Sequence, residues 1–233
     1  MKSATDYLDG QVLLIDKPYE WSSFQALNAV KWALRKKFDF TKKFKIGHAG
    51  TLDPLATGLL VICTGKFTKK IPELQGQIKE YTGTFMLGAT TPSYDLETEV
   101  DQTYSTSHIT EKAIQDILPQ FRGKIEQIPP VFSALKKDGK RLYEFAREGK
   151  QVEIKSRMVE IHAFEITRLE LPEVDFTVVC SKGTYIRSLA HDFGKALQSG
   201  AHLTVLRRTK IGDFNVSNAV TPEVFRENLN ENG

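Results

Sequence analysis

The sequence predicts an α+β fold, in which a mixed, mainly antiparallel central sheet is flanked by helices. Two observations lead to this prediction. Short runs rich in β-branched and aromatic residues recur along the chain and indicate strands. Most of these runs are joined by turns or by one segment with helical spacing, which favours antiparallel pairing of neighbours. A chain of 233 residues can bury a substantial core and could form one large domain or two small ones, and we expect a single domain over residues 1–233.

The first third of the chain contains a strand, a helix and two further strands. Residues 11–16 are a first strand, ended by Lys17-Pro18. Ser22 and Gln25 then form a capping-box pattern, and apolar residues recur at helical spacing until about Lys37. Residues 59–63 are a continuous apolar run, which indicates a buried strand. A short helical turn over 67–74 and a strand over 80–87 follow.

The remaining elements are predicted from the same signals. A polar loop covers 88–102, and Thr110 caps a helix that Gly123 stops. A loop insertion with a short helix occupies about 124–152 and contains an Asp138-Gly139 turn. Strands are expected over 152–171 and 174–180, then a helix closed by Gly200 and a strand over 202–210. Thr221-Pro222-Glu223 opens a final short helix.

The composition is that of an ordinary globular protein, with 40% hydrophobic and 26% charged residues. The longest apolar runs are about five residues, whereas a membrane-spanning helix needs about 20. The N-terminus lacks the apolar core of an export signal. Cys63 and Cys180 each end an apolar run and are expected to be buried, not to form a disulfide or a metal site. We therefore expect a cytoplasmic protein without a membrane segment.

Basic residues are unevenly distributed, although the net charge is only +3. Between residues 31 and 50 there are seven of them and a single acid, Asp39. Further basic clusters lie at 66–70, at 136–141 and at Arg207-Arg208 with Lys210. If these clusters share one face, they would follow a phosphate backbone. A charge run alone is more often an ordinary solvated surface.

The segment from Gly47 to Leu60 is the strongest candidate for a catalytic site. It holds a single carboxylate, Asp53, among Gly50, Pro54 and Gly58. Glycine permits positive φ and proline fixes its own φ and restricts the preceding residue, so the pattern predicts a loop of fixed shape. The loop leads directly into the buried strand at 59–63. An Asp-Pro pair in a glycine-rich loop can also be an ordinary turn.

Four motifs give this segment a context. The loop reads His-Ala-Gly-Thr-Leu-Asp-Pro-Leu-Ala-Thr-Gly (48–58). It is followed, in order, by Lys-Glu-Tyr (79–81), Gln-Ile-Pro-Pro-Val-Phe-Ser-Ala-Leu-Lys (127–136) and Ser-Lys-Gly-Thr-Tyr-Ile-Arg (181–187). Together they resemble the signatures of the TruB family of pseudouridine synthases, and the resemblance runs from about Gly10 to Asp213. Lys17-Pro18 with Ser22-Ser23 is similar to the family's Lys-Pro-x-Gly-x-Thr/Ser-Ser opening, except that Glu20 replaces the glycine.

The resemblance implies an activity and a substrate. TruB enzymes isomerise uridine 55 in the T-loop of tRNA, so the expected partner is the T-arm of tRNA. The reaction needs no metal and no cofactor, and the sequence has no nucleotide-binding glycine motif or zinc-type cluster. The family also implies that the 124–152 insertion grips RNA. We expect a monomer, and the chain is too short to contain the full C-terminal RNA-binding domain of many bacterial members.

The resemblance also assigns roles to individual residues. Asp53 would form a transient covalent adduct with the sugar or the base, and the sequence leaves both open. Tyr81 would pack on the uracil and assist proton transfer. The positions that would contact the substrate are His48, Tyr185, Leu206, Lys17 and Lys69.

Arg187 falls in the first turn of a predicted helix, where its charge opposes the helix dipole. It therefore needs an acidic partner. We expect Asp53 to be that partner, because an ion pair would keep the carboxylate ionised and orient it.

Two other classes of protein remain open at this stage. A nucleosidase or glycoside hydrolase would break a similar bond, but it usually needs a second carboxylate, and none is evident near Asp53. A non-catalytic RNA-binding protein would also account for the basic clusters.

Overall fold

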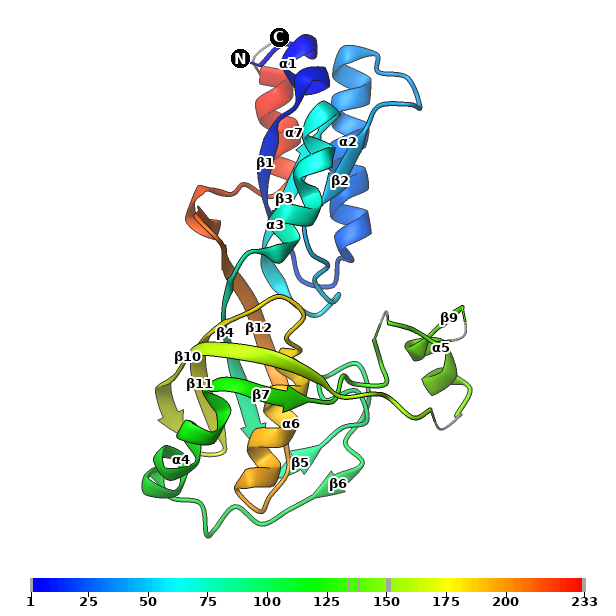
Figure 1. Cartoon of the computed structure of the whole chain (residues 1–233). Coiled ribbons are helices and arrows are strands. Elements are labelled where there is room, and N and C mark those ends of the chain that lie inside the picture. Colours follow the sequence, from blue (N-terminus) through cyan, green and yellow to red (C-terminus); the bar gives the residue numbers. More distant parts are fainter. Residues whose placement is uncertain (1, 134, 138, 150–151, 232–233) are drawn as a thin grey trace. The chain divides into compact units, whose positions relative to one another are not determined.

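The computed structural model describes residues 2–133, 135–137, 139–149 and 152–231. The chain forms two compact units (Figure 1). The first consists of Met1–Tyr81 and Leu206–Gly233, and the second of Thr82–Val205. Strands β4 (Lys79–Leu87) and β12 (Ala201–Ile211) each contribute residues to both units. No helix in the described part of the chain is long and apolar enough to cross a membrane.

The first unit is a small mixed sheet with helices on it. Its strands pair in the order β1-β3-β12-β4, with β2 on β3 and β13 on β12. Strand β12 runs parallel to β3, whereas β1 and β2 run antiparallel to it, so the predicted mixed sheet is confirmed. The other elements of this unit are α1 (Ala4–Asp9), β1 (Val12–Lys17), α2 (Ser23–Phe38), β2 (Ile46–His48), β3 (Thr57–Thr64), the 3₁₀ helix Gly65–Lys70, α3 (Ile71–Gly76), β13 (Phe214–Asn215), the 3₁₀ helix Val216–Asn218 and α7 (Pro222–Glu231).

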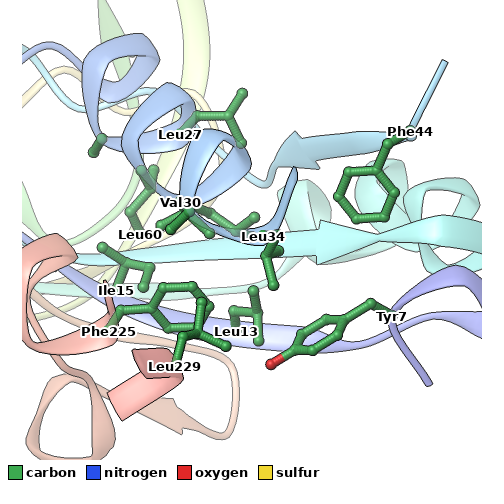
Figure 2. Close-up of a cluster of buried hydrophobic side chains, with 13 residues drawn as sticks. Tyr7, Leu13, Ile15, Leu27, Val30, Leu34, Phe44, Leu60, Phe225 and Leu229 are labelled. Atoms are coloured by element: carbon green, nitrogen blue, oxygen red, sulfur yellow. The ribbon is translucent and has the colours of Figure 1, made fainter. Parts of the chain in front are cut away.

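Strand β3 is buried on both faces, which explains its continuous apolar run. On one face, Leu60 packs with residues of β1 against Leu27, Val30 and Leu34 of α2 and Phe225 of α7 (Figure 2). On the other face, Leu59 and Val61 pack against residues of α3, β13 and the following 3₁₀ helix. The alternation places successive side chains on opposite faces of the strand.

Helix α2 begins and ends where the sequence predicts. Ser22 is its N-cap, and the reciprocal bonds of the capping box with Gln25 are both present. Asp39 ends the helix in a left-handed conformation, two residues after the predicted end at Lys37. The local sequence was sufficient here because a capping box uses only contacts within one turn.

The second unit is built around a sheet in the order β12-β4-β11-β10-β7, in which β10 pairs antiparallel with both β11 and β7. Its core is a cluster of phenylalanine rings, in which Phe193 of α6 lies 5.4 Å from Phe85 of β4 and 6.0 Å from Phe164 of β10 between ring centroids. The remaining elements are β5 (Ala89–Thr90), β6 (Gln102–Thr103), α4 (Glu111–Ile117), the 3₁₀ helix Leu118–Phe121, β7 (Gly123–Gln127), β8 (Lys136–Lys137), β9 (Lys140–Arg141), α5 (Leu142–Arg147), β10 (Arg157–Glu170), β11 (Glu173–Cys180) and α6 (Ile186–Ala196).

The structure corrects several predicted boundaries. Strand β7 was not predicted, because Ile125 is its one apolar residue. Strand β10 begins at Arg157 and not at 152, since Arg157 is the first residue that pairs with β7, and Pro129-Pro130 prevent β7 from continuing. Strands β8 and β9 pair antiparallel on either side of the predicted turn at Asp138-Gly139, of which Asp138 lies outside the described residues. Cys63 and Cys180 are buried, as predicted.

The turn between β1 and α2 contains the departure from the family pattern noted above. Glu20 adopts a φ of 64°, which is the left-handed conformation that glycine accepts most readily. The backbone thus keeps the shape that the family's glycine would allow, and Glu20 bears the strain of about 1–2 kcal/mol.

We expect Glu20→Gly to be about 1 kcal/mol more stable than Glu20→Ala, because only glycine relieves the strain and part of the gain is lost to its greater freedom when unfolded. Glu20 is exposed, so neither change disturbs packing. Urea unfolding of both variants measures the difference. Equal stability of the two would contradict a strained backbone at this position.

Candidate active site

The loop that carries Asp53 joins β2 to β3 and is shorter than predicted. Gly47 and His48 already belong to β2, and Thr57 and Gly58 to β3, so the loop comprises residues 49–56. The Ala56 N–H donates to the carbonyl of Asp53 at 3.1 Å and closes a turn around the carboxylate. Asp53 itself is partly exposed. The predicted fixed loop therefore exists, with its acid accessible to solvent.

The two glycines of this segment are both required by its geometry. Gly50 has a φ of 99° and Gly58 a φ of 102°. A Cβ at Gly58 would lie 2.3 Å from the carbonyl oxygen of Arg208, so β3 and β12 approach more closely there than any side chain allows. These glycines predicted the loop, but the sequence did not indicate that the backbone of Arg208 lies against Gly58.

A buried hydroxyl from α2 holds the residue before Asp53. The Leu52 N–H donates to Ser23 Oγ at 2.7 Å, and the same hydroxyl donates to the Leu52 carbonyl at 3.0 Å. Ser23 and Leu52 are 2% and 3% exposed. Because both backbone groups of Leu52 are bonded to one side chain, the start of the turn is fixed relative to α2.

A buried ammonium group holds the residue after Asp53. Lys17 is fully buried, and its Nζ donates to the carbonyls of Pro18, Trp21 and Pro54 at 2.9, 2.5 and 3.2 Å. Burial lowers the pKa of Lys17 from its usual 10.5 to about 8, although the negative charge of Asp53 opposes this shift. Lys17 is therefore charged at neutral pH. It ties the turn containing Glu20 to the Asp53 loop.

A buried guanidinium joins the start of the loop to the strand that follows it. Arg208 is 1% exposed; its Nε donates to the Leu59 carbonyl at 2.8 Å and its terminal nitrogen to the Gly50 carbonyl at 2.9 Å. The prediction that Arg208 belongs to a solvent-facing basic cluster was wrong. Its neighbour Arg207 points the opposite way from the strand and makes two bonds to Asp16, at 2.6 and 3.0 Å.

The other predicted site residues of the first unit lie on its strands and on the adjacent 3₁₀ helix. Burial lowers the pKa of His48, and the nearby charge of Arg208 lowers it further, so the imidazole is neutral at neutral pH. Leu206 is partly buried, and its carbonyl accepts from Thr57 Oγ1 at 3.4 Å, just after the loop. Tyr81 is a buried residue of β4, whereas Lys69 is exposed and lines a separate pocket.

The predicted site residues of the second unit lie at the start of α6. Arg187 is 3% exposed; its Nε lies 3.5 Å from Asp95 Oδ2, and its terminal nitrogen donates to the Ser93 carbonyl at 3.2 Å. Arg187 thus has an acidic partner, as its position in the first turn of α6 predicts, and Asp95 is one such partner. A pairing with Asp53, which belongs to the first unit, remains a prediction. Asp95 was missed because it lies 92 positions from Arg187 in a polar loop.

Tyr185 is the N-cap residue of α6, and its backbone is held by a buried amide. Gln127 Oε1 accepts from the Tyr185 N–H at 2.8 Å, while its Nε2 donates to the Tyr185 carbonyl at 3.0 Å. The Arg157 guanidinium lies 4.5 Å from the centre of the Tyr185 ring. Gln127 begins the motif at 127–136, so this motif positions the segment that leads into Arg187.

The described part of the 124–152 insertion pairs basic with aromatic side chains. Lys140 lies 5.0 Å from the centre of the Phe145 ring, and Arg141 lies 5.9 Å from that of Tyr143. Residues 134, 138, 150 and 151 of this insertion lie outside the described residues.

Comparison with known proteins identifies the class. Residues 35–186 match the profile "TruB family pseudouridylate synthase (N terminal domain)", and residues 187–232 match "tRNA pseudouridylate synthase B C-terminal domain". A tRNA pseudouridine synthase B of Flavobacterium johnsoniae is 70% identical over 96% of this chain and 98% of that protein. One of Phocaeicola vulgatus is 53% identical over 97% of this chain and 96% of that protein.

A solved structure agrees with these matches. The chain superposes on a structure titled "Crystal Structure of a Cbf5-Nop10-Gar1 Complex" with a TM-score of 0.67 and 29% identity, covering 92% of this chain and 52% of that one. These matches identify the chain as a pseudouridine synthase, which is an isomerase. The chain belongs to the TruB family, whose members act on tRNA.

Two adjacent serines provide a test of the loop's attachment. We expect Ser23→Ala to lose about 2 kcal/mol of stability, because it leaves both backbone groups of Leu52 buried without their partner, and also to lower kcat. Ser22→Ala removes a helix cap and costs about 1 kcal/mol.

Within the described residues the Ser22 side chain bonds Gln25 and makes no bond to the loop, so Ser22→Ala should keep its kcat. Chemical denaturation and single-turnover kinetics measure the two quantities. If both variants keep wild-type kcat, the bond between Ser23 and Leu52 does not position Asp53.

Proposed function

We propose that this enzyme converts uridine 55 in the T-loop of tRNA into pseudouridine, with Asp53 as the nucleophile. The observation that carries the proposal is a single, partly exposed carboxylate on a loop whose backbone is bonded to three buried side chains, Ser23, Lys17 and Arg208. A nucleophile held in this way needs little reorganisation before it reacts.

The proposed reaction begins when the target uridine turns out of its stack, at a cost of a few kcal/mol. Asp53 attacks the sugar or the base, the bond between N1 and the sugar breaks, and the uracil rotates. A bond from C5 to the sugar then forms and the bond to Asp53 breaks; C5 loses its proton, and N1, which carries none in uridine, gains one. Substrate and product have the same atoms, so the reaction consumes no co-reactant.

Arg187 would serve as the counter-ion of Asp53. A guanidinium has five N–H donors in a planar fork, so it can bond Asp95, the Ser93 carbonyl and a second carboxylate together. Tyr81 would pack on the uracil and assist the final proton transfer. The two units would then act together as one catalytic domain.

The remaining candidate residues would shape the substrate site. His48 is neutral and would fill space or hydrogen-bond the RNA, and Tyr185 and Leu206 would line the pocket. The bonds of Lys17 to three carbonyls favour a role in loop shape over a phosphate contact. Lys69, which is exposed, suits phosphate binding. We further propose that the enzyme acts as a monomer on the T-arm, in the cytoplasm.

A tritium-release assay on tRNA labelled at uridine C5 tests the nucleophile. We expect Asp53→Asn to lower turnover by about 10⁴-fold or more while tRNA affinity is largely kept, because the amide is isosteric but cannot attack. Asp213→Asn, an exposed position in the same unit, is the control. Substantial turnover by Asp53→Asn would contradict the assignment, and release of free uracil would indicate a nucleosidase.

A second prediction concerns the support of Arg187. Asp95→Asn should lower kcat on the order of 10²-fold, because the guanidinium loses its charged partner and its orientation. Asp175→Asn is a matched control, since Asp175 bonds another arginine of the same unit, Arg168, at 2.6 Å. Equal kcat values for the two variants would rule out a positioning role for Asp95.

A further inference from the structure

Helix α2 exposes two large aromatic side chains that the fold does not use. Phe24 is 65% exposed and Trp32 57% exposed, and both lie opposite the face that packs on β1 and β3. With Asn28 and Lys36 they follow a spacing of four residues, which forms one stripe along a helix. A solvent-facing helix seldom carries two such rings without a partner.

The charge of α2 is entirely positive. Residues 23–38 include Lys31, Arg35, Lys36 and Lys37 and contain no acid. Lys36 Nζ lies 5.2 Å from the centre of the Trp32 ring, so a cation and an aromatic face are presented side by side. Proteins that bind single-stranded nucleic acid use this combination, because bases stack on the ring while phosphates meet the cation.

A lysine-rimmed pocket begins at Asp39, the residue that caps the C-terminal end of α2. Arg35 Nε donates to the Phe40 carbonyl at 3.1 Å and so joins the helix to the pocket wall. The pocket has a volume of about 590 Å³. Its floor includes Phe40 and Phe44, whose stacked rings are 4.4 Å apart, and its lysines are Lys43, Lys45, Lys66 and Lys69.

The other end of α2 holds the Asp53 loop through the bond between Ser23 and Leu52. From Phe24 to Lys36 the helix rises about 18 Å, at 1.5 Å per residue. The stripe therefore begins next to the Asp53 loop and extends about 18 Å from it along α2, so one tRNA bound at Asp53 can also contact the stripe. The excess of positive charge on the helix and at the pocket favours RNA over an apolar protein surface or a neutral ligand.

We propose that the outer face of α2 and the adjoining pocket bind unpaired nucleotides of tRNA that lie outside the T-arm. Their bases would stack on Phe24 and Trp32, and their phosphates would contact Lys36 and the pocket lysines. The inference rests on the proposed function, because it assumes that tRNA is the substrate. It adds a second contact surface, away from the Asp53 loop, which recognises the rest of the tRNA.

The test compares full-length tRNA with an isolated T-arm hairpin. Base stacking on one aromatic side chain typically contributes about 1–3 kcal/mol, so a Phe24→Ala, Trp32→Ala double variant should bind full-length tRNA at least about 10-fold more weakly. Its affinity for the hairpin should not change. Met158→Ala, which removes a residue 65% exposed on β10, is the apolar control. Lys36→Glu should likewise weaken the binding of full-length tRNA, whereas Lys112→Glu, which changes an exposed helix lysine of the second unit, should not.

Fluorescence gives a readout that does not depend on the double variant folding. The chain has two tryptophans, so Trp21→Phe leaves Trp32 as the sole reporter. Full-length tRNA should quench Trp32, and the T-arm hairpin should not. Unchanged affinity for full-length tRNA, absence of quenching, or an equal loss for both RNAs would overturn the inference. Loss of turnover in Asp53→Asn would still stand in each case, so the proposed function is tested separately.

Discussion

The bonds between the Asp53 loop and three buried polar side chains are the constraint on which the site depends. Ser23 fixes Leu52, Lys17 fixes Pro54, and Arg208 bonds carbonyls near both ends of the loop. All three side chains come from elements that also build the core of the first unit. The packing of α2 and β1 therefore sets where the carboxylate stands, and a change in the core would be felt at Asp53.

The same arrangement determines the local electrostatics. Burying a cation costs several kcal/mol unless it is paired or hydrogen-bonded, and Lys17 and Arg208 are both at most 1% exposed. Backbone carbonyls accept from each, and the charge of Asp53 favours the charged form of Lys17. Burial lowers the pKa of His48, and the charge of Arg208 lowers it further, so the neutral imidazole is favoured. One carboxylate thus lies among fixed positive charges, with a neutral imidazole on the preceding strand.

Local signals in the sequence predicted much of the fold, and non-local contacts account for what was missed. The capping box of Ser22 and Gln25 and the glycines around Asp53 act within a few residues, so their effects could be inferred. Arg208, by contrast, bonds Gly50 across 158 positions, and Lys17 bonds Pro54 across 37. Lysine and arginine are usually exposed, so the sequence did not indicate that Lys17 and Arg208 are buried. Asp95 was missed for the same reason, and β7 because only its pairing with β10 makes it a strand.

The most direct test of the account is hydrogen exchange at the Leu52 amide in the enzyme without RNA. If the loop is fixed before substrate binds, this amide should exchange as slowly as those of β3, since only a large opening would release it from Ser23. Exchange as fast as that of an exposed loop amide such as Thr51 would show that the loop opens freely. The carboxylate of Asp53 would then be positioned by the RNA and not by the protein.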